Sequence, residues 1–144
     1  MEDRFAALDG VVDAVAGYMG GKSENPTYQQ VCNDETGHAE TVEVTFDPRT
    51  IDYHQLLETF FENHDPTTSN RQGPNVGSQY RSTIFCVHTE EAEAAREVIE
   101  GMRARGAFGG REIVTEVVHP APCFWKAEDH HQDYHARHRG SCEI

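Results

Sequence analysis

Residues 39–63, AETVEVTFDPRTIDYHQLLETFFEN, change their hydrophobic period halfway along the stretch. In the first part apolar and polar side chains alternate, so that Val42, Val44 and Phe46 share one face. This period of two predicts a half-buried β-strand. Over residues 52–63 the apolar side chains recur at helical spacing, which predicts an amphipathic helix. A strand followed at once by a helix favours a fold in which both kinds of element pack together.

The rest of the chain continues this interleaving of strands and helices. Further helices are predicted over residues 2–8, 89–106 and 127–138, with a single helical turn within 25–31. Further strands are predicted over residues 11–18, 80–87 and 111–120. Thr89 is the predicted N-cap of its helix. Residues 64–78 form a polar loop, and ordered loops of this length are usually functional. We therefore predict an α+β fold, a two-layer sandwich of a mixed β-sheet and packed helices.

The composition of the 144 residues is that of one globular domain, expected to span residues 1–144. A formal net charge of −13 makes nucleic acid and anionic membranes poor partners. No membrane-spanning stretch or signal segment is visible, so the cytoplasm is the expected location. In that compartment, cysteines without a CxxC pair predict free or redox-active thiols, not structural disulfides or zinc. The cysteines are Cys32, Cys86, Cys123 and Cys142.

Three stretches carry motifs of high specificity. They are GYMGGKSENPTYQQVCNDETGHAETVEVTFDP (17–48), FFENHDPTTSNRQGPNVGSQYRSTIF (60–85) and AEDHHQDY (127–134). The motifs TGHAE, NHDP and GSQYRS, in this order and spacing, resemble those of the A-type peptide methionine sulfoxide reductases. The likeness covers nearly the whole chain. It implies a ferredoxin-like core within the predicted sandwich.

The resemblance implies reduction of methionine-S-sulfoxide, free or in proteins, to methionine, a repair of oxidised protein. In the family a cysteine or selenocysteine of a Gly-Cys-Phe-Trp motif attacks the sulfoxide sulfur. A glutamate shares a proton with the sulfoxide oxygen, and two tyrosine hydroxyls hold that oxygen. A second cysteine condenses with the resulting sulfenic acid, and thioredoxin or a similar dithiol reduces the new bond. By their motifs, the catalytic and substrate-binding residues are Glu40, Tyr28 and Tyr80. No cofactor is implied.

Glu40 also stands out without the family, because it begins the alternating strand among apolar neighbours. Such neighbours are expected to desolvate its carboxyl group and to keep it partly protonated near neutral pH. Taken alone, an acid at this position is more often a solvated strand-edge residue. Tyr28 and Tyr80, taken alone, are core aromatics whose hydroxyls are satisfied elsewhere.

One position in the loop 64–78 departs from the family pattern. The family often has an aspartate in RQG-x-D-x-G, where this chain has Asn75. An asparagine side chain hydrogen-bonds but carries no charge. We therefore expect Asn75 to serve catalysis by positioning and not by electrostatics.

The Gly-Cys-Phe-Trp motif does not occur in this sequence. In the family Glu-x-x-Phe follows that motif almost at once, and here EDRF begins at Glu2. The chain is therefore expected to be an N-terminally truncated domain whose nucleophile and first strand lie upstream of Met1. Three explanations stay open: a selenocysteine codon read as a stop, a misassigned start of a cysteine enzyme, or a true loss leaving an inactive sulfoxide-binding domain. The first two explanations are together favoured over a true loss, and of these two the selenocysteine explanation is slightly preferred. The chain by itself is expected to reduce the sulfoxide poorly or not at all.

Three cysteines of the chain are candidates for a role in the reaction, two as a substitute nucleophile and one as the resolving cysteine. The triplet CFW at 123–125 copies part of its motif, but the family has an aromatic pair at this place before the AED-x-HQ-x-Y helix. Cys123 is therefore interpreted as a half-buried spectator thiol. Substitution for the nucleophile by Cys123, or by Cys32, is the lesser alternative. Cys142 lies in a predicted mobile tail, 139–144, roughly where the family has a resolving cysteine; an ordinary terminal cysteine is an equal alternative.

The predicted last helix offers a second class of site. Histidines at helical spacing and neighbouring aspartates could ligate a metal. They are His131, His135, His138, Asp129 and Asp133. Helical histidines without other fixed ligands are a weak signal, so a solvated histidine-rich helix is preferred and no metal is expected. We expect a monomer.

Overall fold

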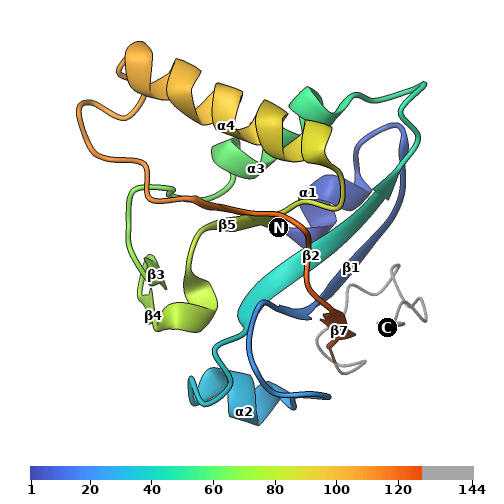
Figure 1. Ribbon diagram of the computed structural model, residues 1–144, viewed down its shortest axis with the longest axis vertical. Helices are drawn as coiled ribbons and strands as arrows, with labels where there is room; N and C mark the ends of the chain where they lie inside the picture. Colours follow the sequence, from blue (N-terminus) through green and yellow to red (C-terminus); the bar gives the residue numbers. More distant parts are fainter. Residues whose placement is uncertain (128–144) are drawn as a thin grey trace. The chain divides into compact units, whose positions relative to one another are not determined.

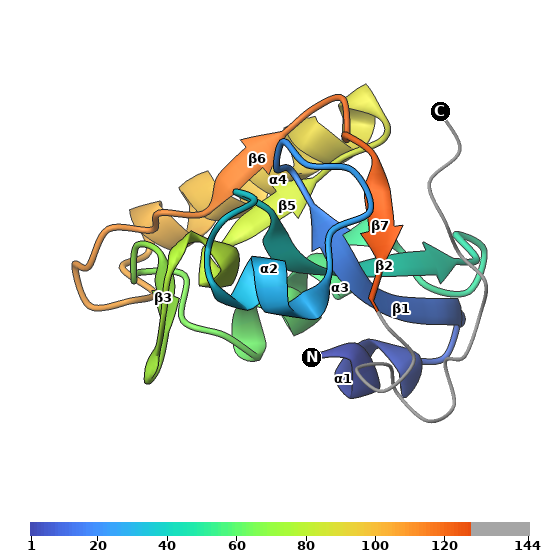
Figure 2. The ribbon, with the colours of Figure 1, turned by 90° about the horizontal axis from the view of Figure 1, so that it is seen from below.

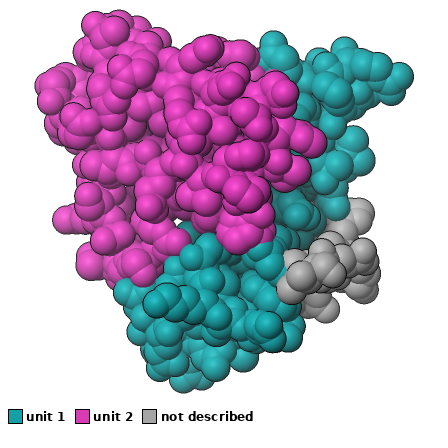
Figure 3. All heavy atoms as spheres, in the orientation of Figure 1, with its two compact units in different colours: residues 1–52, 123–144 teal, residues 53–122 magenta. Residues whose placement is uncertain are grey.

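The computed structural model describes residues 1–127 of the chain. These residues fall into two compact units, which Figure 3 colours separately. One unit consists of residues 1–52 and the segment that begins at Cys123, and the other of residues 53–122. Each unit contains helices and strands, so the predicted α+β class is confirmed. Within the described residues, no helix has the length and apolar character needed to cross a membrane.

The first unit is built on a three-stranded antiparallel sheet of strand order β2-β1-β7. The central strand is β1 (Val11–Met19). On its two sides lie β2 (Ala39–Phe46) and β7 (Phe124–Lys126), as Figures 1 and 2 show. The faces of β2 are as predicted, because Glu43 and Thr45 are exposed while the alternate apolar residues are half-buried.

Two short helices accompany this sheet. Helix α1 (Glu2–Ala6) precedes β1, and its Phe5 side chain is buried. Helix α2 (Tyr28–Cys32) lies in the long connection between β1 and β2 (Figure 1). In the register of these two strands Tyr18 is opposite Glu40, so the connection leaves and re-enters the sheet beside Glu40.

Strand β7 fits against β1 because position 17 has no side chain. A Cβ atom on Gly17 would lie 2.4 Å from Cζ of Phe124 and 2.4 Å from the carbonyl oxygen of Trp125. Phe124 is buried, and its ring occupies the space that a larger residue at position 17 would need. The glycine thus allows the end of the described chain to pair with its beginning.

The second unit combines two helices with a pair of parallel strands. They are α3 (Tyr53–Glu62), α4 (Thr89–Ala104), β5 (Thr83–Phe85) and β6 (Glu116–Val118). In Figure 1, α4 lies over α3 and β5, and Figure 2 shows β6 beside β5. The core of this unit joins side chains of both helices and of the segment before β6. Its buried members are Phe61, Ile99, Met102 and Ile113.

The polar loop predicted over residues 64–78 contains structure that the sequence did not reveal. It forms a small hairpin of β3 (Arg71–Gln72) and β4 (Asn75–Val76). A short 3-10 helix, η1 (Ser78–Tyr80), follows it. Two-residue strands are too short to show a hydrophobic period, which explains why the sequence predicted only a loop.

Other boundaries also differ from the prediction. The strands expected over 80–87 and 111–120 are reduced to β5 and β6, because only three residues of each find a partner in the parallel ladder. The N-cap of α4 is His88 and not Thr89; the Glu91 carboxylate accepts the His88 N–H. The sequence did not predict β7. The helix predicted over 127–138 and the tail 139–144 lie outside the described residues, apart from Ala127.

Candidate active site

Tyr28 is the first residue of α2, and the start of that helix is held by a capping box. The Thr27 hydroxyl oxygen accepts the Gln30 N–H at 3.2 Å, and Oε1 of Gln30 accepts the Thr27 N–H at 2.9 Å. Val31, on the same short helix, is buried in the core of the first unit. Tyr28 as a whole residue is 38% exposed. The local sequence therefore places an accessible phenol on a helix turn that is fixed at both its cap and its buried face.

Glu40 is the second residue of β2, on the edge strand of the three-stranded sheet in the described chain. Its side chain reaches solvent, yet the surrounding chain removes water from part of the carboxylate. This desolvation raises the pKa of Glu40 above the ordinary glutamate value, as the sequence predicted. A carboxyl group with a raised pKa that remains accessible can give a proton to a ligand near neutral pH.

His38 is a further residue of the TGHAE motif, and the sequence did not single it out. Its side chain is buried, and its ring lies between two backbone groups of the connection that leads to α2. The Gly21 N–H donates to Nδ1 at 2.9 Å, and Nε2 lies 2.7 Å from the carbonyl oxygen of Ser23. The signal that could have found it is its place two residues before Glu40, in one of the three motifs that carry the family resemblance.

The thiols differ in their surroundings. Cys86 is fully buried, its Sγ lies 3.6 Å from the Tyr53 hydroxyl, and burial raises the pKa of the thiol. Cys32 takes no part in a disulfide and is half-buried at the end of α2. Cys123 takes part in a disulfide. The prediction of a spectator thiol at Cys123 was therefore wrong, because the sequence does not reveal which cysteines the fold brings together.

Tyr80 closes η1 in the second unit, and its side chain is half-buried. The Tyr80 N–H donates to the carbonyl oxygen of Gly77 at 3.0 Å. Gly77 has a φ of +144°, and a Cβ atom there would lie 2.0 Å from Oε1 of Gln79. Because Gln79 is buried, position 77 accepts only glycine without a local rearrangement. The turn that presents Tyr80 is thus specified by the GSQY sequence.

Asn75 begins β4 at the exposed end of the hairpin, where it pairs with Gln72. The two ends of the hairpin are joined by a hydrogen bond, in which the Gly77 N–H donates to the carbonyl oxygen of Asn70 at 2.8 Å. The side chain of Asn75 therefore stands on a closed loop that ends directly before η1. The structure places it in the same unit as Tyr80.

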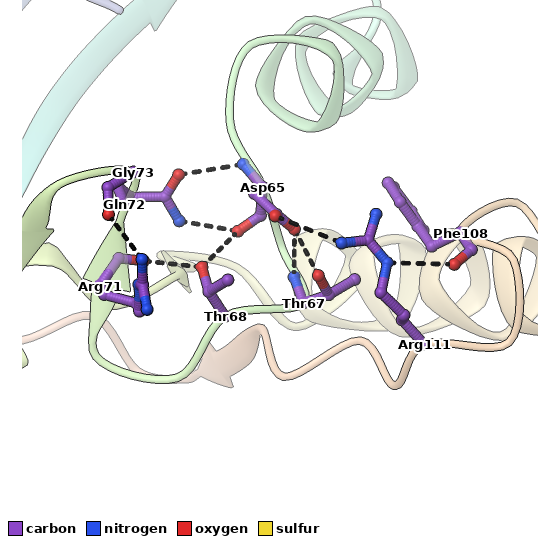
Figure 4. Close-up of polar contacts among 8 residues, drawn as sticks. All are labelled: Asp65, Thr67, Thr68, Arg71, Gln72, Gly73, Phe108 and Arg111. Carbon is purple, nitrogen blue, oxygen red and sulfur yellow. Dashed lines mark hydrogen bonds and ion pairs between the residues drawn. The ribbon is translucent and has the colours of Figure 1, made fainter.

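Asp65 holds the other end of this loop, as Figure 4 shows. Oε1 of Gln72 accepts the Asp65 N–H at 3.0 Å, and Nε2 of Gln72 donates to the Asp65 carbonyl oxygen at 2.7 Å. The Asp65 carboxylate accepts from the N–H and the hydroxyl of Thr67 and pairs with Arg111 at 3.7 Å. These hydrogen bonds from Thr67 lower the pKa of Asp65. The NHDP and RQG motifs are therefore one hydrogen-bonded arrangement.

His64 fixes the strand that follows Tyr80. Its Nδ1 lies 2.6 Å from the carbonyl oxygen of Phe60, and its Nε2 lies 2.7 Å from the Ser82 hydroxyl oxygen. Ser82 is buried, and its Oγ also lies 2.7 Å from Oγ1 of Thr115. Burial lowers the pKa of His64 and favours its neutral form. A neutral ring that donates through Nδ1 to Phe60 accepts through Nε2 from Ser82.

The structure divides the predicted site residues between the two units. Tyr28 and Glu40 belong to the first unit, and Tyr80 and Asn75 to the second. Cys142 lies outside the described residues, as do the histidines and aspartates of the last predicted helix. Among residues 1–127, no group of three or more histidine, cysteine, aspartate or glutamate side chains is arranged to hold a metal.

The carboxyl group of Glu40 and the hydroxyl groups of Tyr28 and Tyr80 are groups that can donate a proton or a hydrogen bond to an oxygen atom of a ligand. A carboxyl group with a raised pKa supplies a proton, and phenol hydroxyls donate hydrogen bonds to an oxygen that gains negative charge. Of these groups, Tyr28 and Glu40 are exposed, both in the first unit. Such donors suit a reaction in which an oxygen atom leaves its substrate.

Comparison with known proteins agrees with this chemistry. A family model described as peptide methionine sulfoxide reductase matches residues 1–144. The chain is 54% identical over 141 residues to the peptide methionine sulfoxide reductase MsrA of Methanoculleus marisnigri, covering 97% of this chain and 84% of that protein. Its structure is similar to that of methionine sulfoxide reductase A of Corynebacterium diphtheriae, with a TM-score of 0.85, 38% identity and coverage of 92% of this chain and 66% of that one.

Mxr1 from Saccharomyces cerevisiae, in complex with Trx2, shares the fold with a TM-score of 0.59 at 22% identity, covering 99% of this chain and 78% of that one. The motifs, the fold and the family match over residues 1–144 lead to one conclusion. The chain belongs to the peptide methionine sulfoxide reductase family.

Proposed function

We propose that this chain provides the acid and the oxygen-binding groups for the reduction of methionine-S-sulfoxide to methionine, and so for the repair of oxidised proteins. The observation that carries the proposal is the accessible Glu40 carboxyl, whose pKa is raised by desolvation. Protonated Glu40 gives its proton to the sulfoxide oxygen as a nucleophile attacks the sulfur. Tyr28 and Tyr80 donate hydrogen bonds to the same oxygen, and Asn75 positions the substrate.

The nucleophile in this proposal is the cysteine or selenocysteine of a Gly-Cys-Phe-Trp or Gly-Sec-Phe-Trp motif upstream of Met1. Support comes from the order of motifs in the family and from the thiols of residues 1–127. Cys86 is buried with a raised pKa, which disfavours the reactive thiolate. Cys123 is engaged in a disulfide, and Cys32 is half-buried. Attack through Cys32 or Cys123 is the alternative.

The later steps need a resolving thiol and an external reductant. The attack transfers the sulfoxide oxygen to the enzyme as a sulfenic or selenenic acid, and methionine leaves. A resolving thiol, assigned to Cys142, then forms a disulfide or selenylsulfide bond and releases the oxygen as water. A thioredoxin-type dithiol reduces that bond; Mxr1, a solved structure of the same fold, forms a complex with Trx2. A cytoplasmic monomer stays a prediction.

The test compares the chain with a version that also has an upstream strand and a Gly-Cys-Phe-Trp segment, called here the extended chain. Turnover of methionine-S-sulfoxide with dithiothreitol or thioredoxin is the measurement. We expect turnover by the extended chain, little or none by the chain itself, and none by a matched Gly-Ser-Phe-Trp control.

Other results would redirect the proposal. Robust turnover by the chain itself that is lost on Cys123→Ser or Cys32→Ser would make that cysteine the nucleophile. An extended chain that binds the sulfoxide without turnover would be a vestigial binding domain. Reading the coding DNA in frame upstream of Met1 separates cysteine, selenocysteine and true loss.

A further inference from the structure

Residues 20–38 leave the sheet after Met19 and return to it at Ala39, and these two residues are register partners. This connection contains α2, which lies beyond the shared end of β1 and β2 in Figure 1. It therefore joins the two site residues of the first unit. Tyr28 lies within the connection, and Glu40 follows its end.

The His38 ring closes the base of this connection through both of its nitrogen atoms. Nδ1 accepts the Gly21 N–H at 2.9 Å. An imidazole nitrogen that accepts carries no proton, so the proton of the neutral ring is on Nε2. Nε2 then donates to the carbonyl oxygen of Ser23 at 2.7 Å. The ring is only 2% exposed, which shields both bonds from competition with water.

Backbone contacts hold the same two segments together. Across the two segments, the Lys22 N–H donates to the carbonyl oxygen of Thr36 at 2.9 Å. Within the second segment, the His38 N–H donates to Oγ1 of Thr36 at 3.1 Å, which fixes the turn that carries the ring. A Cβ atom on Gly21 would lie 2.4 Å from the His38 backbone nitrogen and 2.5 Å from the Thr36 carbonyl oxygen. The approach is therefore possible only because residue 21 is glycine.

We propose that His38 is a positioning residue for the reaction, because its ring holds the ends of residues 20–38 together and so fixes Tyr28 relative to Glu40. The proposal rests on the proposed function for the roles of these two residues. His38 does not touch substrate in this scheme. It acts through the Gly21 N–H and the Ser23 carbonyl, which it binds as acceptor and donor.

The alternative is a histidine that merely fills the core, and substitutions separate the two roles. Phenylalanine keeps an aromatic ring and removes both polar contacts. Asparagine places an acceptor oxygen near the position of Nδ1, and glutamine places an N–H donor near that of Nε2. If only volume matters, phenylalanine is tolerated best. We call the two hydrogen bonds of the His38 ring, to the Gly21 N–H and to the Ser23 carbonyl oxygen, the His38 clamp. If this clamp matters, asparagine and glutamine each restore one of its two bonds.

The first measurement concerns the clamp itself and needs no turnover. Nitrogen-15 NMR of the chain is expected to show a neutral His38 with a bare Nδ1 and a proton on Nε2. Hydrogen exchange at the Gly21 amide is expected to accelerate by about tenfold or more in His38→Phe, and to stay slow in His38→Asn. A ring protonated on Nδ1 would overturn the proposal, and this result requires no variant to fold.

The second measurement is kinetic and uses the extended chain. We expect His38→Phe to lower kcat/KM by roughly 10- to 100-fold, mainly through kcat, because misplacing a catalytic group by about 1 Å costs this much. His38→Asn is expected to recover most of the loss. The control is His54→Phe, a change at an exposed histidine of α3, which is expected to leave kcat/KM unchanged.

The outcomes keep this inference separate from the proposed function. Unchanged kcat/KM in His38→Phe, with the Gly21 amide exposed to exchange, would overturn the positioning role. Equal losses in the Phe and Asn variants, although asparagine protects the Gly21 amide, would also overturn it. If the extended parent chain shows no turnover while the ring and amide signals are as expected, the proposed function fails and the clamp remains only as a structural feature.

Discussion

Nε2 of His64 lies 2.7 Å from the hydroxyl oxygen of Ser82, two residues beyond Tyr80. The same ring lies against Phe60, with 4.0 Å between the ring centroids, and contacts the Phe60 carbonyl oxygen through Nδ1. One histidine thus ties the end of α3 to the segment that follows η1. Its neutral form is part of the folded structure, and this has a measurable consequence for stability.

We expect the free energy of unfolding to fall on acidification below about pH 6.5, the ordinary histidine value, in part through His64. Burial lowers the pKa of His64 in the folded chain, so the unfolded chain binds this proton more readily. The contribution is therefore complete above 6.5 and is lost as the pH falls toward the lowered value. His64→Gln is expected to destabilise the chain at pH 7 by about 1–3 kcal/mol and to flatten this acid dependence.

Urea denaturation at pH 5 and pH 7 measures both effects. The control is His54→Gln, because His54 is exposed on α3. An acid dependence that is the same in His64→Gln and the parent chain would show that His64 does not titrate on unfolding.

We expect Glu40→Gln to lower kcat/KM of the extended chain by about 10²- to 10⁴-fold, because the proton donor is lost. It is not expected to destabilise the fold. Desolvation raises the pKa of Glu40, so the folded chain holds this proton more tightly, and the stabilising contribution is lost as the pH rises through the raised value. At pH 7 the glutamine variant should therefore be at least as stable as the parent.

Glu43→Gln is the matched control for Glu40. It lies on the same strand, and desolvation and the neighbouring Asp13 raise its pKa as well. Its substitution is expected to leave kcat/KM unchanged. Equal losses from the two substitutions would mean that the charge of β2, and not a specific acid, supports the reaction.

We expect Gly17→Ala to destabilise the first unit by about 1–3 kcal/mol, because the added methyl group overlaps Phe124 and the backbone of Trp125. Gly101→Ala is the opposite case. Gly101 lies inside α4, and within residues 1–127 an added methyl group there would meet no atom within 4 Å outside its own helix, so alanine should stabilise the chain by about 0.5–1 kcal/mol. Thermal or urea unfolding of the two variants measures the difference. A neutral Gly17→Ala would disprove the close packing of β7 on β1.

We expect Asn75→Asp to change kcat/KM of the extended chain little, and Asn75→Ala to lower it by about tenfold. An aspartate keeps the hydrogen-bond acceptor, whereas alanine removes the polar group altogether. Because the side chain is exposed, both variants should keep the stability of the parent within about 0.5 kcal/mol. A large gain in rate on Asn75→Asp would instead indicate that a negative charge serves the reaction at this position.

The local elements and the family motifs could be predicted from the amino-acid sequence. The strand predicted from the alternation of apolar and polar residues, β2, and the helix predicted from the helical spacing of apolar residues, α3, form where expected. Both patterns depend only on residues close together in the sequence. The raised pKa of Glu40 was also predicted, from the apolar residues near it in the sequence, and burial is its cause in the structure. Assignment to the reductase family followed from the order of short motifs.

Which distant groups meet is settled only by the packing of the whole chain. The pairing of β7 with β1 places Trp125 opposite Tyr18. A strand of three residues is too short to show a hydrophobic period, so the sequence did not predict this pairing. The roles of His38 and His64 depend on partners 17 and 18 residues away, Gly21 and Ser82. A buried polar group takes its partner from whichever segment the packed chain brings within hydrogen-bond distance. Sequence patterns record local geometry, and the choice of such partners arises only when the chain is folded.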